Sequence, residues 1–146
     1  MKNQDLLPEY KLVLIGGKGW KYKNLESLIE PNNREHVVSL GYVPNEDLPS
    51  LYTGAKIFIF PSVYEGFGMP VLEARACGTR VVTTDIPELR EAGGPDTIYI
   101  KPTQKGIQQG ILDALKQSSP QLLSPNLPTW EESSLALATA LCGERQ

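Results

Sequence analysis

Two carboxylate side chains, those of Glu65 and Glu73, are the groups in this sequence whose type and spacing best fit chemistry on a bound ligand. They enclose residues 66–69, Gly-Phe-Gly-Met, where glycine allows backbone conformations and close approaches that a Cβ would block. Carboxylate oxygens accept hydrogen bonds from sugar hydroxyls, whereas free backbone N–H groups suit a phosphate. We therefore expect a ligand that joins sugars to phosphates, with both acids facing its sugar portions.

The elements that must position these acids are a strand, a loop, a helix and a second strand. Residues 56–61 are a short apolar run with β-branched and aromatic side chains, which predicts a buried strand, and residues 80–84 predict the next strand. Pro70 favours a helix start, because the first helical N–H needs no partner, and Gly78 is expected just past the helix end. Glu73 would then lie in the first turn and point back toward the loop.

The same residues also have a purely structural explanation. Glu73 would complement the helix dipole, a contribution of roughly 0.3–1 kcal/mol. In that case Glu65 would be a solvated loop residue, and Phe67 would fill the core.

Two glycines and a loop earlier in the chain are further ligand candidates. Gly16 and Gly17 close a hydrophobic strand, where they either form a tight turn or let a ligand approach the strand end. Residues 36–40 predict a second strand, and the loop beyond it offers Tyr42 and Val43 to a nucleobase. In α/β sheets ligands bind beyond the carboxyl ends of the strands, where both segments fall.

The rest of the chain alternates between helix and strand signals. Helices are expected over residues 18 to about 30, 45–52, 85–90, 103–116 and 130–141, and a last strand over 97–100. This alternation predicts an α/β fold with a doubly wound, Rossmann-like parallel sheet of about five strands. We expect one domain over residues 1–117, a Ser- and Pro-rich linker over 118–129 and a final helix over 130–146.

Local signals give several other residues structural roles. Asn45 is expected to cap the helix that follows it, and Leu48, Leu51 and Tyr52 recur at helical spacing as core contacts. Glu88 is expected to be a cap or surface acid, and Cys77 a buried packing thiol.

Composition excludes several classes of protein. The 146 residues suffice for one domain, and 40% hydrophobic with 21% charged residues is ordinary for a globular chain. A net charge of −3 provides no basic face for nucleic acid. The two cysteines have no metal-binding spacing. No apolar run reaches membrane length and no signal peptide is recognisable, so we expect a cytoplasmic protein without indicated membrane association.

The segment EGFGMPVLEARACGTRVV resembles the signature of family 4 glycosyltransferases, the retaining enzymes of the GT-B fold. The resemblance continues through YKLVLIGGKGW, VVSLGYVPNEDLPSLYTGAKIFIFPS and PELREAGGPDTIYIKP, and covers roughly residues 10–115. It implies the C-terminal, donor-binding half of a GT-B fold, lacking its first strand and the N-terminal acceptor domain. Residues 1–117 would then be the nucleotide-sugar-binding domain, and residues 130–146 a helix that crosses over to the other domain.

The resemblance also implies roles for single residues. Glu65 would be the catalytic residue that contacts the transferred sugar, Glu73 would hold the nucleotide ribose, and the backbone of residues 66–69 would contact sugar and phosphate. The implied donor site comprises Gly16, Gly17, Tyr42, Val43, Glu65, Gly66, Phe67, Gly68, Met69, Val71 and Glu73. No metal or other cofactor is expected, since the sequence contains no D-x-D triplet.

The implied reaction is transfer of a glycosyl group from a GDP- or UDP-linked sugar to an acceptor, with a mild preference for mannosyl. The family's diphosphate-binding Arg and Lys precede the position of Tyr10, so this chain is expected to bind nucleotide weakly and to be inactive alone. The alternative is a non-catalytic nucleotide-sugar-binding or interaction module of the same fold.

Overall fold

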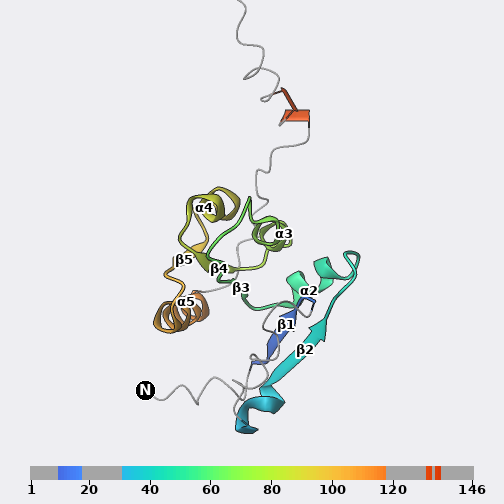
Figure 1. The fold of residues 1–146 in the computed structure, drawn as a ribbon, viewed down its shortest axis with the longest axis vertical. Coiled ribbons are helices and arrows are strands. Elements are labelled where there is room, and N and C mark those ends of the chain that lie inside the picture. The colour runs from blue at the N-terminus through green and yellow to red at the C-terminus, as the bar shows by residue number, and fades with distance from the viewer. Residues whose placement is uncertain (1–9, 18–30, 118–130, 133, 136–146) are drawn as a thin grey trace, which may run out of the picture. The chain divides into compact units, whose positions relative to one another are not determined.

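The computed structural model describes residues 10–17, 31–117, 131–132 and 134–135 (Figure 1). The chain divides into two compact units, Met1–Ser50 and Leu51–Gln146. Within the described residues short parallel strands alternate with helices, which confirms the predicted α/β, Rossmann-like fold class. The strands form one two-stranded and one three-stranded sheet, whereas the sequence predicted one sheet of about five strands.

The first unit contains a parallel strand pair. The strands β1 (Leu12–Ile15) and β2 (Val37–Gly41) align from their first residues onward, and the 3-10 helix η2 (Pro31–His36) leads directly into β2. Just beyond β1, the N–H of Gly16 donates to the carbonyl of Gly41 at 2.8 Å. This bond holds the carboxyl ends of the two strands side by side.

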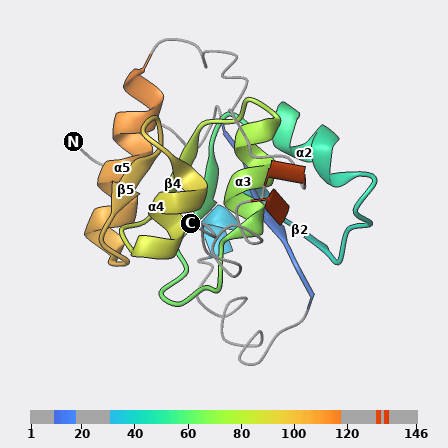
Figure 2. The ribbon, with the colours of Figure 1, turned by 90° about the horizontal axis from the view of Figure 1, so that it is seen from above.

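The second unit is a layered α/β arrangement around the sheet β3-β4-β5. Its elements are α2 (Leu48–Gly54), which spans the boundary of the units, β3 (Phe58–Phe60), α3 (Met69–Ala76), β4 (Val81–Thr84), α4 (Pro87–Gly93), β5 (Ile98–Ile100) and α5 (Gln104–Lys116). All three strands are parallel, with β4 in the middle. The helices α3 and α4 cover one face and α5 the other (Figure 1), and Figure 2 shows these elements from above. Helices on both faces make this sheet doubly wound.

The helix α5 packs directly on the sheet of this unit. Val82, Ile100 and Ala114 form a buried cluster between them. A Cβ at Gly110 would come within 2.7 Å of Ile100 Cγ2 and 2.8 Å of Val82 Cγ1. Any side chain at Gly110 would therefore push α5 away from the strands.

The end of α3 follows the sequence prediction. Gly78 adopts a left-handed φ of 76°, and its N–H donates to the carbonyl of Arg75 at 2.8 Å. The N–H of Thr79 donates to the carbonyl of Ala74 at 2.9 Å. These two bonds form a Schellman motif, which requires a residue such as glycine after the helix.

The start of α2 differs from the prediction. Asn45 was expected as its cap, but the helix begins at Leu48. The N–H of Asp47 donates to the carbonyl of Pro44 at 3.0 Å, which closes a turn over the intervening residues. Residues 45–47, whose polar side chains predicted a first helical turn, form this turn instead.

Some predictions fall outside the described residues, namely the helix from residue 18 to about 30 and the linker 118–129. Of the expected helix 130–146, residues 131–132 and 134–135 are described and are helical. Cys77, expected to be buried, is half-buried at the end of α3.

Two neighbouring threonines on β4 provide a test of the core. Thr83 Oγ1 donates to the carbonyl of Phe60 at 2.7 Å, whereas the fully buried Thr84 Oγ1 has no hydrogen-bond partner among the described residues. Because an unpaired buried hydroxyl is costly, we expect Thr84→Val to raise the free energy of unfolding by about 1 kcal/mol. The matched Thr83→Val change should lower it by roughly 1–2 kcal/mol, since the carbonyl of Phe60 loses its donor. The midpoint of denaturant unfolding measures both changes if the denaturant dependence (the m-value) stays constant. Equal effects of the two substitutions would contradict the view that only Thr83 has a hydrogen-bond partner.

Candidate functional site

The segment before α3 presents free backbone donors. Gly68 caps the helix with φ 85° and ψ 43°, a left-handed conformation, and its carbonyl accepts from the N–H of Val71 at 2.9 Å. Within the described part of the chain, no hydrogen bond occupies the N–H groups of residues 66–69. Free N–H groups at a helix N-terminus favour a phosphate or a hydroxyl oxygen.

The same segment is open on one side and packed on the other. A Cβ at Gly66 would meet no atom within 4 Å, and Phe67 and Met69 are 39% and 51% exposed. A Cβ at Gly68 would instead lie 2.5 Å from Leu89 Cδ2 of α4. The exposure of Phe67 rules out the explanation that it simply fills the core, and the contact with Leu89 fixes the helix start against α4.

Glu73 lies deeper in α3 than the sequence predicted. The helix begins at Met69, so Glu73 is its fifth residue and falls in the second turn, not the first. Its exposed carboxylate accepts a hydrogen bond through Oε2 from the hydroxyl of Tyr52, at 3.0 Å. Glu73 therefore does not lie in the first helical turn, where a carboxylate would complement the helix dipole, and that structural explanation does not account for it.

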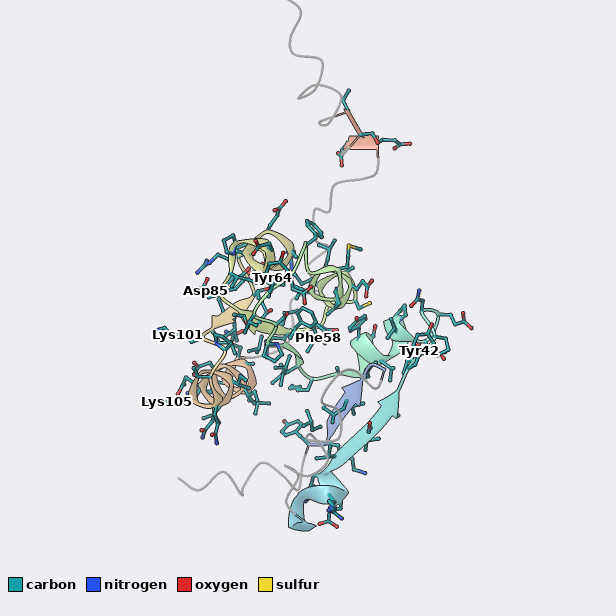
Figure 3. The ribbon with its side chains drawn as sticks, viewed as in Figure 1. Tyr42, Phe58, Tyr64, Asp85, Lys101 and Lys105 are labelled. Atoms are coloured by element: carbon teal, nitrogen blue, oxygen red, sulfur yellow. The ribbon has the colours of Figure 1, made fainter. Side chains whose placement is uncertain are left out.

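Tyr52 is a residue of this site that sequence reasoning placed only in the core. It is 7% exposed, and its ring meets that of Phe58 edge to face at 5.2 Å; Figure 3 shows Phe58 on β3. Burial, and then the hydrogen bond to Glu73, raise the pKa of Tyr52 to about 12. The signal available in the sequence was a tyrosine at a core position, since a buried phenol usually has a polar partner.

Glu65 lies half-buried in the loop between β3 and α3. Ser62 Oγ donates to the carbonyl of Tyr64 at 3.1 Å just before it, which shapes the loop. In the described residues no hydrogen bond or ion pair engages Glu65, and none joins it to Glu73. The two acids therefore differ. Glu73 accepts a hydrogen bond from Tyr52, whereas Glu65 has no partner among the described residues.

Val71 does not fit the predicted donor contact. Its side chain is fully buried, and its N–H is occupied by the carbonyl of Gly68. Because the residue lies two positions inside α3 on the face toward the core, it supports the helix rather than facing a ligand.

The candidates of the first unit lie together at the carboxyl ends of β1 and β2. Gly16 and Gly17 follow β1, and the bond from Gly16 to the carbonyl of Gly41 brings them beside the loop of Tyr42 and Val43. Tyr42 is 76% exposed and Val43 half-buried. That these residues and those of the second unit form one donor site stays a prediction.

Other features of the described residues concern other kinds of site. A groove of about 370 Å³ lies between β5 and α5, and none of the predicted donor residues lines it. Its lining includes Lys101 and Lys105, which Figure 3 labels. Among the described residues no three His, Cys, Asp or Glu side chains cluster as metal ligands would. No helix in that part of the chain has the length and apolar character to cross a membrane.

Sequence comparison relates the chain to mannosyltransferases. It is 43% identical over 112 residues to O-antigen chain mannosyltransferase B of Escherichia coli, which is 75% of this chain and 29% of that protein. It is 28% identical over 119 residues to O-antigen chain mannosyltransferase RfbU of Salmonella typhimurium, which is 80% of this chain and 34% of that protein. The chain thus spans about a third of the length of these relatives.

Structural and family comparisons agree with that relation. Sucrose-phosphate synthase from Thermosynechococcus elongatus matches with a TM-score of 0.70 and 25% identity, over 90% of this chain and 38% of that chain. This similarity supports the Rossmann-like architecture predicted for one half of a GT-B fold. The family model of the glycosyl transferases group 1 matches residues 1–125. The chain therefore belongs to the group 1 glycosyltransferases, as its sequence motifs predicted.

Proposed function

We propose that this chain is the donor-binding portion of a retaining glycosyltransferase, which moves a glycosyl group from a nucleoside diphosphate sugar to an acceptor. The observation that carries the proposal is the set of free N–H groups at residues 66–69, placed at the start of the helix that also holds Glu73. Backbone donors suit the diphosphate, and carboxylates suit the hydroxyls of the sugars on either side of it.

The proposed chemistry breaks the bond between the anomeric carbon and the diphosphate oxygen and forms one to an acceptor oxygen with the same configuration. Negative charge develops on the departing diphosphate, and N–H donors at a helix start stabilise it without any reorganisation. Glu65 would face the transferred sugar, where it either stabilises positive charge on the ring or orients its hydroxyls. No metal ion is required in this scheme.

Mannose is the preferred transferred sugar in the proposal. Both O-antigen relatives carry mannosyltransferase in their names, and so does a third, the serotype-specific mannosyltransferase WbdA of Escherichia coli, which is 37% identical over 70 residues. The donor would be a GDP- or UDP-linked sugar, and the acceptor would be bound chiefly by another domain. A cytoplasmic location stays a prediction.

The exposure of β1 supports the proposal that this domain uses a further strand. Leu12 and Val13 on β1 are 50% and 44% exposed, although an all-apolar parallel strand is normally covered. We propose that another part of the polypeptide supplies this strand, and that the chain alone is inactive.

The alternative is a nucleotide-sugar-binding module without catalytic activity. Both functions use the same N–H groups and Glu73, so binding does not separate them. Substitution of Glu65 does separate the two functions, because a binding module needs no group that stabilises charge on the sugar ring.

The test is to titrate GDP, UDP and ADP into the purified chain and to measure binding by calorimetry and NMR. We expect at least one nucleotide to bind with a roughly millimolar dissociation constant, about −4 kcal/mol, with shifts at the amides of residues 66–69. Glu73→Gln should weaken this binding, whereas the exposed Glu91 on α4 offers a matched Glu→Gln control that should not. No binding of any nucleotide would refute the proposed function.

A further inference from the structure

We propose that Tyr52 is a positioning residue for the donor nucleotide: its buried hydroxyl holds Oε2 of Glu73 and turns Oε1 toward the ribose. The inference rests on the proposed function, because it takes Glu73 as the ribose acceptor. It adds to that function a residue from a different helix, 21 positions earlier in the chain.

Tyr52 is well fixed for such a role. Its ring is buried and packs edge to face on Phe58, with ring centroids 5.2 Å apart. Its carbonyl accepts a hydrogen bond from the buried Thr79 Oγ1 at 2.5 Å, next to the glycine that ends α3. Both ends of the residue are therefore tied to neighbouring elements, and the hydroxyl has little freedom to move.

Glu73 depends on this contact for its orientation. The side chain is exposed, and in the described residues its only hydrogen bond is the one that Oε2 accepts from Tyr52 at 3.0 Å. A glutamate on a helix surface otherwise samples several rotamers, and ordering it on binding would weaken the complex. A phenol donates one hydrogen, so it engages one oxygen and leaves the other for a ligand hydroxyl.

The hydroxyl of Tyr52 remains a donor throughout the physiological range. Burial and the neighbouring carboxylate raise the pKa of Tyr52 to about 12, which keeps the proton on the phenol. The pair therefore consists of a neutral donor and a carboxylate, which is stronger than a hydrogen bond between neutral groups.

The experiment compares Tyr52→Phe with Tyr99→Phe in the 146-residue chain. Phenylalanine at position 52 retains the ring and its contact with Phe58 and removes only the hydroxyl. Tyr99 is the matched control, because its hydroxyl also donates within the second unit, to the carbonyl of Gly94 at 2.7 Å, away from Glu73. Each protein is titrated by NMR with GDP and UDP and with their 2′,3′-dideoxy analogues, which lack the ribose hydroxyls.

We expect Tyr52→Phe to weaken binding of the ribonucleotide roughly tenfold and to leave binding of the dideoxy analogue nearly unchanged. Combined with Glu73→Gln, it should add little to the loss that Glu73→Gln causes alone, because the two residues act as one unit. Tyr99→Phe should leave the ratio of the two affinities as in the unaltered chain.

The outcomes separate this inference from the proposed function. If Tyr52→Phe weakens binding of the ribonucleotide and of the dideoxy analogue equally, Tyr52 has a purely structural role and the inference is overturned. If Glu73→Gln abolishes the preference for ribose while Tyr52→Phe retains it, the inference fails and the proposed function stands. If the unaltered chain binds none of the four ligands, both are wrong.

Discussion

Gly68→Ala is expected to destabilise this domain strongly. The backbone of Gly68 has φ 85°, where an L-residue costs about 1–2 kcal/mol. The new Cβ would also lie 2.5 Å from Cδ2 of Leu89, whose side chain is fully buried, and such overpacking costs about 1–3 kcal/mol. We expect a total loss of roughly 2–5 kcal/mol, a large part of the stability of a small domain. Denaturant unfolding followed by circular dichroism measures it.

Two controls show whether both causes act. Gly66 precedes the same helix, but its φ is not positive and a Cβ there meets no atom within 4 Å, so Gly66→Ala should stay within about 0.5 kcal/mol of the unaltered chain. Leu89→Ala makes room for the new methyl group. If the clash matters, the double variant Gly68→Ala/Leu89→Ala loses less stability than the sum of the single changes. If the two losses of stability are strictly additive, the clash contributes nothing, and the left-handed backbone of Gly68 is the sole cause of the loss.

Local signals in the sequence were sufficient to predict most elements of the fold. The Schellman end at Gly78 depends on residues close together in the chain, and so does the start of the helix expected from residue 103, where Oγ1 of Thr103 accepts from the N–H of Gly106 at 3.1 Å. The strands were predicted to within about two residues for the same reason, since short apolar runs mark them. The turn at Pro44 shows the limit, because Asn45 fits a turn as well as a helix cap.

Contacts between distant residues could not be predicted. The division of the strands into two ladders depends on which strand edges meet, which no local pattern encodes. The bond between Tyr52 and Glu73 and the packing of Gly68 on Leu89 each join different helices. Sequence reasoning proposed both acids and the glycine loop, but it did not foresee the hydrogen bond between Tyr52 and Glu73 or the burial of the Val71 side chain.

Glu65→Gln is expected to have the largest effect on catalysis in the complete glycosyltransferase that we propose. If the carboxylate stabilises positive charge on the sugar ring, the effect is confined to the transition state, where preorganised electrostatic groups contribute about 10²–10³ in rate. Glutamine retains an acceptor oxygen but loses the charge. We therefore expect kcat for glycosyl transfer to fall by that factor with little change in KM for the donor.

The pattern of kcat and KM also decides between the two roles open to Glu65. A residue that only orients the sugar hydroxyls binds ground state and transition state alike, so its loss would raise KM and leave kcat close to normal. Glu73→Gln should show this second pattern, because the ribose lies away from the breaking bond. The exposed Glu91 on α4 supplies the control substitution to Gln. Unchanged kcat and KM after Glu65→Gln would exclude Glu65 from the site.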